Sequence, residues 1–234
     1  MIRALIVDDE RLARSELLRL LKAHESIEVV GECADAVAAK AAIECLAPDL
    51  IFLDVQMPGA SGFDLLGWLD DVPQVIFTTA FDSYALKAFE VNALDFLQKP
   101  IHADRLAVAL ARAQEQFTRT QARPGRLERI FIKDGARCWF VALRDILLFE
   151  SEGNYTRLYF DGERPLMLRS LNQLEERLEA GRFFRANRRQ IVNLDFVARI
   201  DTAPSGALVL VLGGGLRVEL SRRRAAQFRS RNSL

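Results

Sequence analysis

Short apolar runs alternate with segments of helical periodicity over residues 1–118. The predicted strands cover residues 2–7, 27–33, 49–54, 74–80 and 93–100. The predicted helices lie near residues 12–21, 38–46, 62–69, 83–90 and 103–119. Near-continuous apolar strands separated by helices are typical of a parallel sheet that is covered on both faces. We therefore predict that residues 1–118 form a five-stranded, parallel, doubly wound α/β domain.

The pattern changes after a polar, basic stretch that contains Pro124 and Gly125, which we interpret as a linker over residues 119–126. Residues 127–234 hold shorter apolar runs with turn residues between them. The predicted strands lie within residues 129–133, 137–142, 146–152, 155–160, 165–169, 196–200, 207–212 and 216–220. Residues 170–180 and 221–230 have helical periodicity. This pattern predicts a mostly-β second domain with small helices.

Composition excludes several classes of protein. Half of the 234 residues are apolar, which argues against disorder over the whole chain. No apolar run approaches the roughly 18 residues that a membrane helix needs, and residues 1–8 lack the layout of a signal peptide. Three cysteines and two histidines make a disulfide framework, a zinc site or a histidine-dependent triad improbable. We expect a cytoplasmic protein that does not associate with membranes.

The formal net charge of zero conceals a difference between the two halves. Residues 1–120 hold 11 basic and 19 acidic side chains, whereas residues 121–234 hold 21 basic and 13 acidic ones. Of those 21 basic residues, 20 are arginine. An arginine-rich half of net charge +8 suggests an anionic partner. Salt bridging between the two halves is the alternative explanation.

Polar side chains stand at the ends of four of the five strands predicted in the first half. They belong to Asp8-Asp9, Asp54, Thr78-Thr79 and Lys99, which precedes Pro100. Because ligands collect at the carboxyl ends of parallel strands, these side chains are expected at one edge of the sheet. Clustered carboxylates need a cation, and oxygen ligands without histidine or cysteine favour Mg²⁺. Such a centre can bind a phosphoryl group while one carboxylate attacks phosphorus. Asp54, alone on the central strand, is the better candidate for the nucleophile.

Each of these residues also has an ordinary structural explanation. An aspartate after a strand often caps the next helix, and threonine favours strands on packing grounds alone. A Lys-Pro pair is common in loops. Their occurrence together, each at the end of a different strand, is much harder to explain in this way.

Residues 1–117 resemble the receiver domain of two-component response regulators in the segments LIVDDE, LDVQMPGASG, TTA and FLQKP. The resemblance implies that Asp54 accepts phosphate from a sensor histidine kinase. It also implies that Mg²⁺ is held by Asp8, Asp9, Asp54 and the carbonyl of Gln56. The implied switch residues are Thr79, Phe96 and the phosphate-binding Lys99, which precedes a cis Pro100. Phe96 departs mildly from the family, in which this aromatic residue is often tyrosine.

A phosphohydrolase with an aspartyl-phosphate intermediate is the rival interpretation. Hydrolases of the haloacid dehalogenase type carry a second aspartate two residues after the nucleophile, where it transfers protons. This chain has Gln56 there, and an amide cannot take that role. We therefore expect no enzymatic activity beyond the receiver's own phosphorylation and dephosphorylation.

The second domain resembles the LytTR-type DNA-binding domain over residues 126–231, most clearly in 143–160, 170–178, 183–200 and 216–228. The resemblance implies a β-rich fold that inserts loops into the grooves of DNA. The implied base contacts are Asn154, Arg188 and Arg223. Neighbouring phosphate or flanking contacts are Tyr155, Arg157, Arg189 and Arg222.

The chemistry of arginine agrees with this placement. Arginine reads guanine by two hydrogen bonds and neutralises phosphates. Arg222 and Arg223 stand at a predicted helix start that Ser221 can cap, and a helix N-terminus itself favours a phosphate. One departure concerns the base contacts: Asn187 and Arg189 replace the histidine and serine that are usual in the family.

Together these features predict a two-component response regulator in which phosphorylation of Asp54 controls binding of the second domain to double-stranded promoter DNA. A homodimer is expected on DNA, because dimers match paired half-sites. The competing hypothesis is a receiver that drives a protein-interaction module, with the arginine clusters facing an acidic partner.

Overall fold

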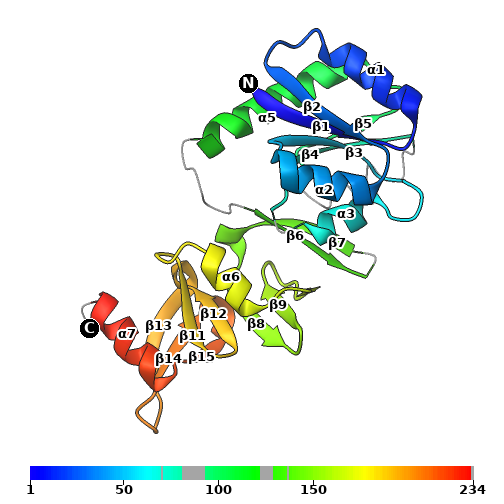
Figure 1. The fold of residues 1–234 in the computed structure, drawn as a ribbon. Coiled ribbons are helices and arrows are strands. Elements are labelled where there is room, and N and C mark those ends of the chain that lie inside the picture. Colours follow the sequence, from blue (N-terminus) through cyan, green and yellow to red (C-terminus); the bar gives the residue numbers. More distant parts are fainter. Residues whose placement is uncertain (70, 81–92, 122–128, 136, 233–234) are drawn as a thin grey trace. The chain divides into compact units, whose positions relative to one another are not determined.

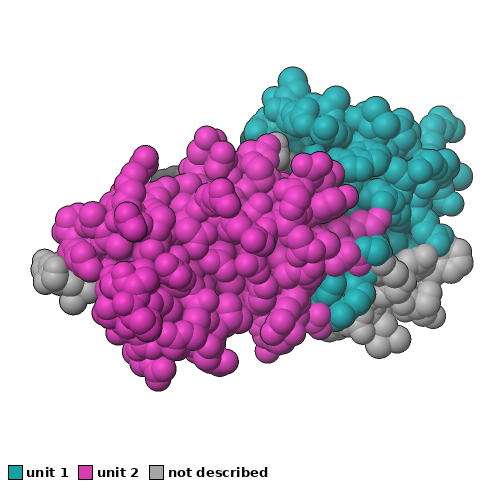
Figure 2. Space-filling model, turned by 90° about the horizontal axis from the view of Figure 1, so that it is seen from below, with its two compact units in different colours: residues 1–125, 135–140 teal, residues 126–134, 141–234 magenta. Residues whose placement is uncertain are grey.

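The computed structural model describes residues 1–69, 71–80, 93–121, 129–135 and 137–232 (Figure 1). The chain divides into two compact units, residues 1–125 with 135–140 and residues 126–134 with 141–234 (Figure 2). Most of the predicted linker falls outside the described residues. The predicted boundaries at residues 118 and 127 therefore stay a prediction.

The first unit is an α/β structure around one parallel sheet of strand order β2-β1-β3-β4-β5. Its strands are β1 (Ile2–Val7), β2 (Ile27–Cys33), β3 (Leu50–Asp54), β4 (Gln74–Thr79) and β5 (Asp95–Gln98). Its helices are α1 (Arg11–Leu21), α2 (Ala36–Leu46), α3 (Gly62–Trp68) and α5 (Ala103–Gln121). The five-stranded parallel prediction is confirmed. The predicted helix at residues 83–90 lies outside the described residues.

Helices cover both faces of this sheet, with α1 and α5 on one face and α2 and α3 on the other (Figure 1). On the first face, Leu17 of α1 and Leu106 of α5 join the same buried cluster as Phe52 of β3. On the other face, the ring of Phe63 in α3 lies 4.8 Å from that of Phe77 in β4. Because β3 is covered from both sides, all five of its residues are buried.

The start of α3 lies directly against the end of β3. A Cβ atom at Gly62 would collide with the carbonyl oxygen of Asp54, so only glycine permits this approach. Ser61 caps the helix by accepting a hydrogen bond from the Asp64 amide at 3.2 Å. This close packing fixes the backbone that carries Asp54.

The second unit is mostly β. It contains an antiparallel sheet of order β10-β9-β8-β12-β11 and a three-stranded sheet, β13-β14-β15. Strands β6 and β7 form a separate pair that precedes both sheets in the chain. These strands are β6 (Arg129–Asp134), β7 (Arg137–Ala142), β8 (Leu148–Glu152), β9 (Tyr155–Tyr159), β10 (Leu166–Met167), β11 (Phe183–Asn187), β12 (Gln190–Asn193), β13 (Val197–Thr202), β14 (Leu208–Leu212) and β15 (Arg217–Glu219). Two α-helices, α6 (Leu171–Arg177) and α7 (Arg222–Asn232), complete it with three short 3₁₀ turns at 143–145, 194–196 and 213–215. The prediction of a mostly-β domain with small helices is confirmed.

One buried cluster joins the sheets of this unit to α7. Leu148 and Val192 of the larger sheet, Leu210 of the smaller one, and Phe228 of α7 all belong to it. The ring of Phe228 meets that of Phe184 edge-on, at 5.3 Å between centroids. Helix α7 is therefore packed against the larger sheet.

Two details of the second unit differ from the prediction. Helix α6 ends at Arg177 rather than at residue 180, because Leu178 is extended and buried. The hairpin of β11 and β12 was not predicted at all. Its turn, Arg188-Arg189, contains no glycine or proline and is stabilised instead by the side chain of Asn187, whose Oδ1 accepts a hydrogen bond from the Arg189 amide at 2.8 Å.

The carboxylate of Asp95 ties α5 to β5 in the first unit. Its side chain is buried, and it accepts hydrogen bonds from Arg105 at 2.8 Å, Arg112 at 3.0 Å and the Phe96 amide at 2.8 Å. Hydrogen bonds from charged donors to a buried carboxylate are stronger than exposed ion pairs.

We expect Asp95→Ala to lower the free energy of unfolding by about 1–3 kcal/mol, because the substitution leaves a buried amide without its acceptor. Urea unfolding followed by circular dichroism measures this change. Glu44→Ala is the control, since the ion pair that Glu44 forms among the described residues, with Lys40 at 3.7 Å, is exposed. Equal losses in both variants would contradict a special role for Asp95.

Candidate functional site

Three carboxylates meet at the carboxyl edge of the first unit's sheet. Asp8 and Asp9 follow β1, and Asp54 ends β3, which pairs in parallel with β1. One carboxylate oxygen from each of the three lies within 4.8 Å of the others. Asp8 and Asp54 are buried, whereas Asp9 is exposed. The cluster consists of oxygen donors alone, which fits Mg²⁺ better than softer metals.

Lys99 reaches this cluster from the end of β5. Its Nζ lies 2.7 Å from Asp8 Oδ2, 2.7 Å from Asp54 Oδ2 and 3.6 Å from Glu10 Oε2. Burial alone would lower the pKa of Lys99, but the hydrogen bonds to Asp54 and Asp8 raise it overall. Burial raises the pKa of Asp8 despite the opposing bonds from Lys99. The ammonium therefore stays charged and offsets the repulsion among the carboxylates.

Of the remaining predicted residues, Gln56 contacts Asp54, and Thr79 and Phe96 lie on β4 and β5. The Gln56 amide donates to Asp54 Oδ1 at 3.1 Å. Thr79 is buried at the end of β4, and its carbonyl accepts from the Lys99 amide at 2.8 Å. Phe96 lies half-buried on β5 opposite Phe77, two positions before Thr79 along β4, so Phe96 and Thr79 point to the same face. The Lys99–Pro100 peptide bond is cis, as the resemblance implies.

Sequence reasoning did not identify Arg14, which holds the loop of the acidic pair. Its guanidinium donates to the carbonyl of Asp8 at 2.8 Å and to that of Asp9 at 3.3 Å. Position 14 falls on the same helical face as the buried residues Leu17 and Leu21. A cation on the inward face of α1 is the signal that could have revealed it.

Three predicted DNA-contacting segments lie close together in the second unit. Strand β12 pairs with β8 so that Gln190 is opposite Glu150, which brings the turn at 188–189 to the same end of the sheet as the turn at 153–154. The Ser221 amide donates to the carbonyl of Ala186 at 3.0 Å, so α7 begins beside β11. Asn154, Tyr155, Arg188, Arg189, Arg222 and Arg223 are all exposed.

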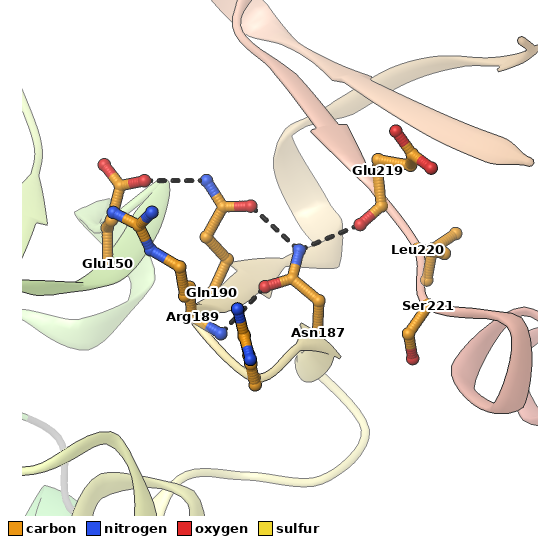
Figure 3. A pocket seen from close by; sticks show the side chains of 8 residues that line it. Glu150, Asn187, Arg189, Gln190, Glu219, Leu220 and Ser221 are labelled. Atoms are coloured by element: carbon orange, nitrogen blue, oxygen red, sulfur yellow. Dashed lines mark hydrogen bonds between the residues drawn. The ribbon is translucent and has the colours of Figure 1, made fainter.

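A pocket of about 540 Å³ lies between the turn at 188–189 and the residues that precede α7 (Figure 3). Its lining contains Glu150, Asn187, Arg188, Arg189, Gln190, Glu219, Leu220 and Ser221. The predicted cap of α7 is present, since Ser221 Oγ accepts from the Arg224 amide at 3.4 Å. The pocket therefore lies between the turn of Arg188 and Arg189 and the end of α7 that begins with Arg222 and Arg223.

The arginines of this unit fall into two groups. Arg157 forms two hydrogen bonds to Glu152 at 2.7 and 2.8 Å, while Arg185 and Arg224 both contact Glu175. By contrast, within the described part of the chain no ion pair or side-chain hydrogen bond engages the guanidinium groups of Arg188, Arg189, Arg222 and Arg223. These four unpaired, exposed cations are available to an anionic ligand.

The two units match two domain families in chain order. Residues 4–111 match the response regulator receiver domain, and residues 136–232 match the LytTr DNA-binding domain. Over 232 residues, 37% are identical to the transcriptional regulatory protein BtsR of Escherichia coli (strain K12), with 95% of each chain covered. The chain belongs to the LytTR family of response regulators. Another LytTR relative, the sensory transduction protein LytT of Enterococcus faecalis, is 32% identical over 241 aligned positions that cover 100% of both chains.

Solved structures resemble each unit separately. The response regulatory domain of protein mrkE from Klebsiella pneumoniae is 30% identical, with a TM-score of 0.47, and covers 51% of this LytTR regulator and 100% of that chain. A LytTr DNA-binding domain from Bacillus cereus is 22% identical, with a TM-score of 0.42. The match covers 44% of the present chain and 95% of the Bacillus cereus chain. Among the helices that the structure describes, none has both the length and the apolar character to cross a membrane.

We expect Asp9→Ala to weaken Mg²⁺ binding more than Asp8→Ala. The receiver resemblance makes Asp9 the direct ligand, and Asp8 is already hydrogen-bonded to Lys99. Calorimetric titration with Mg²⁺ measures both affinities, with Asp35→Ala, a helix cap on α2, as the control. Equal affinities in the wild type and both variants would refute a carboxylate metal site.

Proposed function

We propose that Asp54 accepts a phosphoryl group from a sensor histidine kinase, and that this phosphorylation controls binding of the second unit to double-stranded promoter DNA. The observation that carries the first part is the Lys99 bridge, which holds a cation between Asp8 and Asp54 at 2.7 Å from each. A nucleophile, a metal-binding pair and a phosphate-binding cation thus occupy one edge of the sheet. Together these groups favour the formation of an aspartyl-phosphate.

Each residue has a definite part in this proposal. Asp54 attacks phosphorus, so the bond to the kinase histidine breaks as the phosphorus–oxygen bond to Asp54 forms. Lys99 donates to an oxygen of the transferred group. Asp8, Asp9, Asp54 and the carbonyl of Gln56 would hold Mg²⁺, which would offset the negative charge that develops during transfer. Arg14 keeps the loop of Asp8 and Asp9 in place through their carbonyls.

Thr79 and Phe96 are the residues proposed to move when Asp54 is phosphorylated. A dianionic phosphate on Asp54 draws the Thr79 hydroxyl toward it. Thr79 and Phe96 point to the same face of neighbouring strands, so a shift of Thr79 changes the space available to the half-buried Phe96 ring. The surface beside β4 and β5 is the proposed dimer contact, because a homodimer matches paired half-sites.

We expect Asp54→Asn to preserve the fold and to abolish Mg²⁺-dependent labelling by acetyl phosphate. The reason is that an amide oxygen is a much weaker nucleophile than a carboxylate. Intact-mass spectrometry measures the added phosphate, and circular dichroism checks the fold. Stable phosphate on another aspartate of the variant would refute the assignment of Asp54.

DNA binding is proposed mainly for four arginines that have no ion-pair partner within the described part of the chain. Arg188 and Arg223 are proposed to read base edges together with Asn154, whereas Tyr155, Arg157, Arg189 and Arg222 are proposed as flanking or phosphate contacts. The two turns and the N-terminus of α7 lie close enough to address one DNA surface. Arg157 is the weakest of these candidates, because Glu152 already neutralises its guanidinium.

We expect Arg188→Ala and Arg223→Ala each to lower affinity and to relax preference at one base position by roughly 1–3 kcal/mol. Arg222→Ala is expected to weaken binding to all duplexes about equally. It should also reduce the slope of the logarithm of the binding constant against the logarithm of the salt concentration by roughly one unit. Arg157→Ala should reduce this slope less, since Glu152 already offsets the charge of Arg157. Binding isotherms over a series of salt concentrations, with selected and scrambled duplexes, measure all four variants.

Two results of that series would count against parts of the proposal. Equal losses on both duplexes for Arg188→Ala and Arg223→Ala would mean that these arginines act by charge alone. Binding to an acidic protein partner that duplex DNA does not compete away would favour the protein-interaction hypothesis instead.

A further inference from the structure

The turn that carries Arg188 and Arg189 is stabilised by the side chain of Asn187. Besides accepting from the Arg189 amide, Asn187 donates through Nδ2 to Gln190 Oε1 at 2.9 Å and to the carbonyl of Glu219 at 2.9 Å (Figure 3). Gln190 Nε2 donates in turn to Glu150 Oε1 at 2.9 Å. One amide thus connects the turn to β12 and to the end of β15. Its acceptor and both of its donors are engaged inside the protein.

Arg185 secures the same turn from its other side. Its Nε donates to the carbonyl of Asn187 and its Nη2 to the carbonyl of Arg188, both at 2.7 Å. The Arg185 side chain is 9% exposed, far less than a DNA-contacting arginine requires. Arg185 therefore contributes its hydrogen bonds to the backbone of the turn.

Glu175 connects this turn to the start of α7. One of its carboxylate oxygens lies 3.3 Å from Arg185 Nη1, and the other accepts from Arg224 Nη2 at 2.9 Å. Arg224 directly follows Arg222 and Arg223 in α7. The Ser221 amide adds a backbone hydrogen bond to Ala186. Several independent contacts therefore connect the turn of Arg188 and Arg189 to the start of α7 at Arg222 and Arg223.

We propose that Arg185, Asn187 and Glu175, here called the turn bracket, are positioning residues that set the turn at 188–189 relative to the N-terminus of α7. The inference rests on the proposed DNA-binding function. Attraction to phosphates depends mainly on charge, whereas base reading requires both arginine pairs to be placed at once. Since base reading alone depends on this placement, the bracket contributes to discrimination between sequences, and pre-ordering of the turn lowers the entropy lost when the bases are read.

Two neighbouring glutamates of α6 allow a matched test in the full-length protein. Glu175→Gln and Glu176→Gln remove the same charge, but Glu176 is exposed and, among the described residues, forms no ion pair. Each substitution should slightly raise affinity for any duplex, because it adds one net positive charge. We expect Glu175→Gln alone to lower the ratio of selected-site to scrambled-duplex affinity, by about threefold to tenfold, on the scale of couplings between contacting residues. Equal ratios in the two variants would overturn the inference.

A double-mutant cycle distinguishes positioning from direct base contact by Asn187. Asn187→Ala is expected to lower the affinity ratio by about tenfold in the wild-type background. In an Arg188→Ala, Arg189→Ala background it should change the ratio less than about twofold, because no guanidinium remains on the turn to be positioned. A full effect in that background would show that Asn187 contacts DNA itself, and would overturn the inference.

The probes are a duplex selected by the wild-type protein from a random pool and a scrambled duplex of the same composition. Thermal unfolding by circular dichroism is recorded for each variant, and Glu175→Gln, at a partly exposed position, provides the test if Asn187→Ala unfolds. If the wild type shows neither sequence preference nor salt-dependent binding, the proposed DNA-binding function fails and the bracket fails with it. If the wild type discriminates normally but the glutamate pair behaves alike, the bracket alone fails.

Discussion

The receiver site depends on one balance of charge, the contact of the Lys99 ammonium with Asp8 and Asp54. Parallel pairing of β1 and β3 brings three carboxylates within 4.8 Å of one another, and like charges at that distance repel. Lys99 lies 2.7 Å from two of them and compensates part of that repulsion. The same ammonium links the ends of β1, β3 and β5, which are not all neighbours in the sheet. A change of charge at Asp54 is therefore felt directly at the end of β5.

In the second unit, acidic side chains neutralise part of the excess positive charge. Some of its arginines are neutralised by acids of the same unit, as Arg157 is by Glu152 and Arg185 by Glu175. The paired arginines hold turns and carbonyl groups, while Arg188, Arg189, Arg222 and Arg223 are exposed. Counting arginines thus overstates the number that a ligand can reach, and each guanidinium has to be assigned by its contacts. This division accounts for an arginine-rich domain that keeps an ordered, well-packed structure.

Much of the fold could be read from local pattern. The five parallel strands were predicted because each is a short apolar run that alternates with a segment of helical periodicity, as β3 does. The hairpin of β11 and β12 was missed, because its turn relies on the Asn187 side chain instead of a glycine or proline. The contacts of Asn187 also explain how the hairpin accommodates asparagine where the family usually has histidine. Arg14 and Asp95 were missed for a related reason: their partners are backbone carbonyls and distant side chains.

The sequence by itself determined the positions of the five parallel strands along the chain, the composition of the acidic cluster and the presence of two arginine-rich segments. Periodicity and residue type report such features, since they depend on neighbours along the chain. Only the tertiary structure decided which arginines are paired and that the 188–189 turn lies beside the start of α7. It also revealed the Glu175 contacts with Arg185 and Arg224, which join residues 10 and 49 positions apart. Such long-range pairings follow from sheet register and helix packing, which no local window of sequence contains.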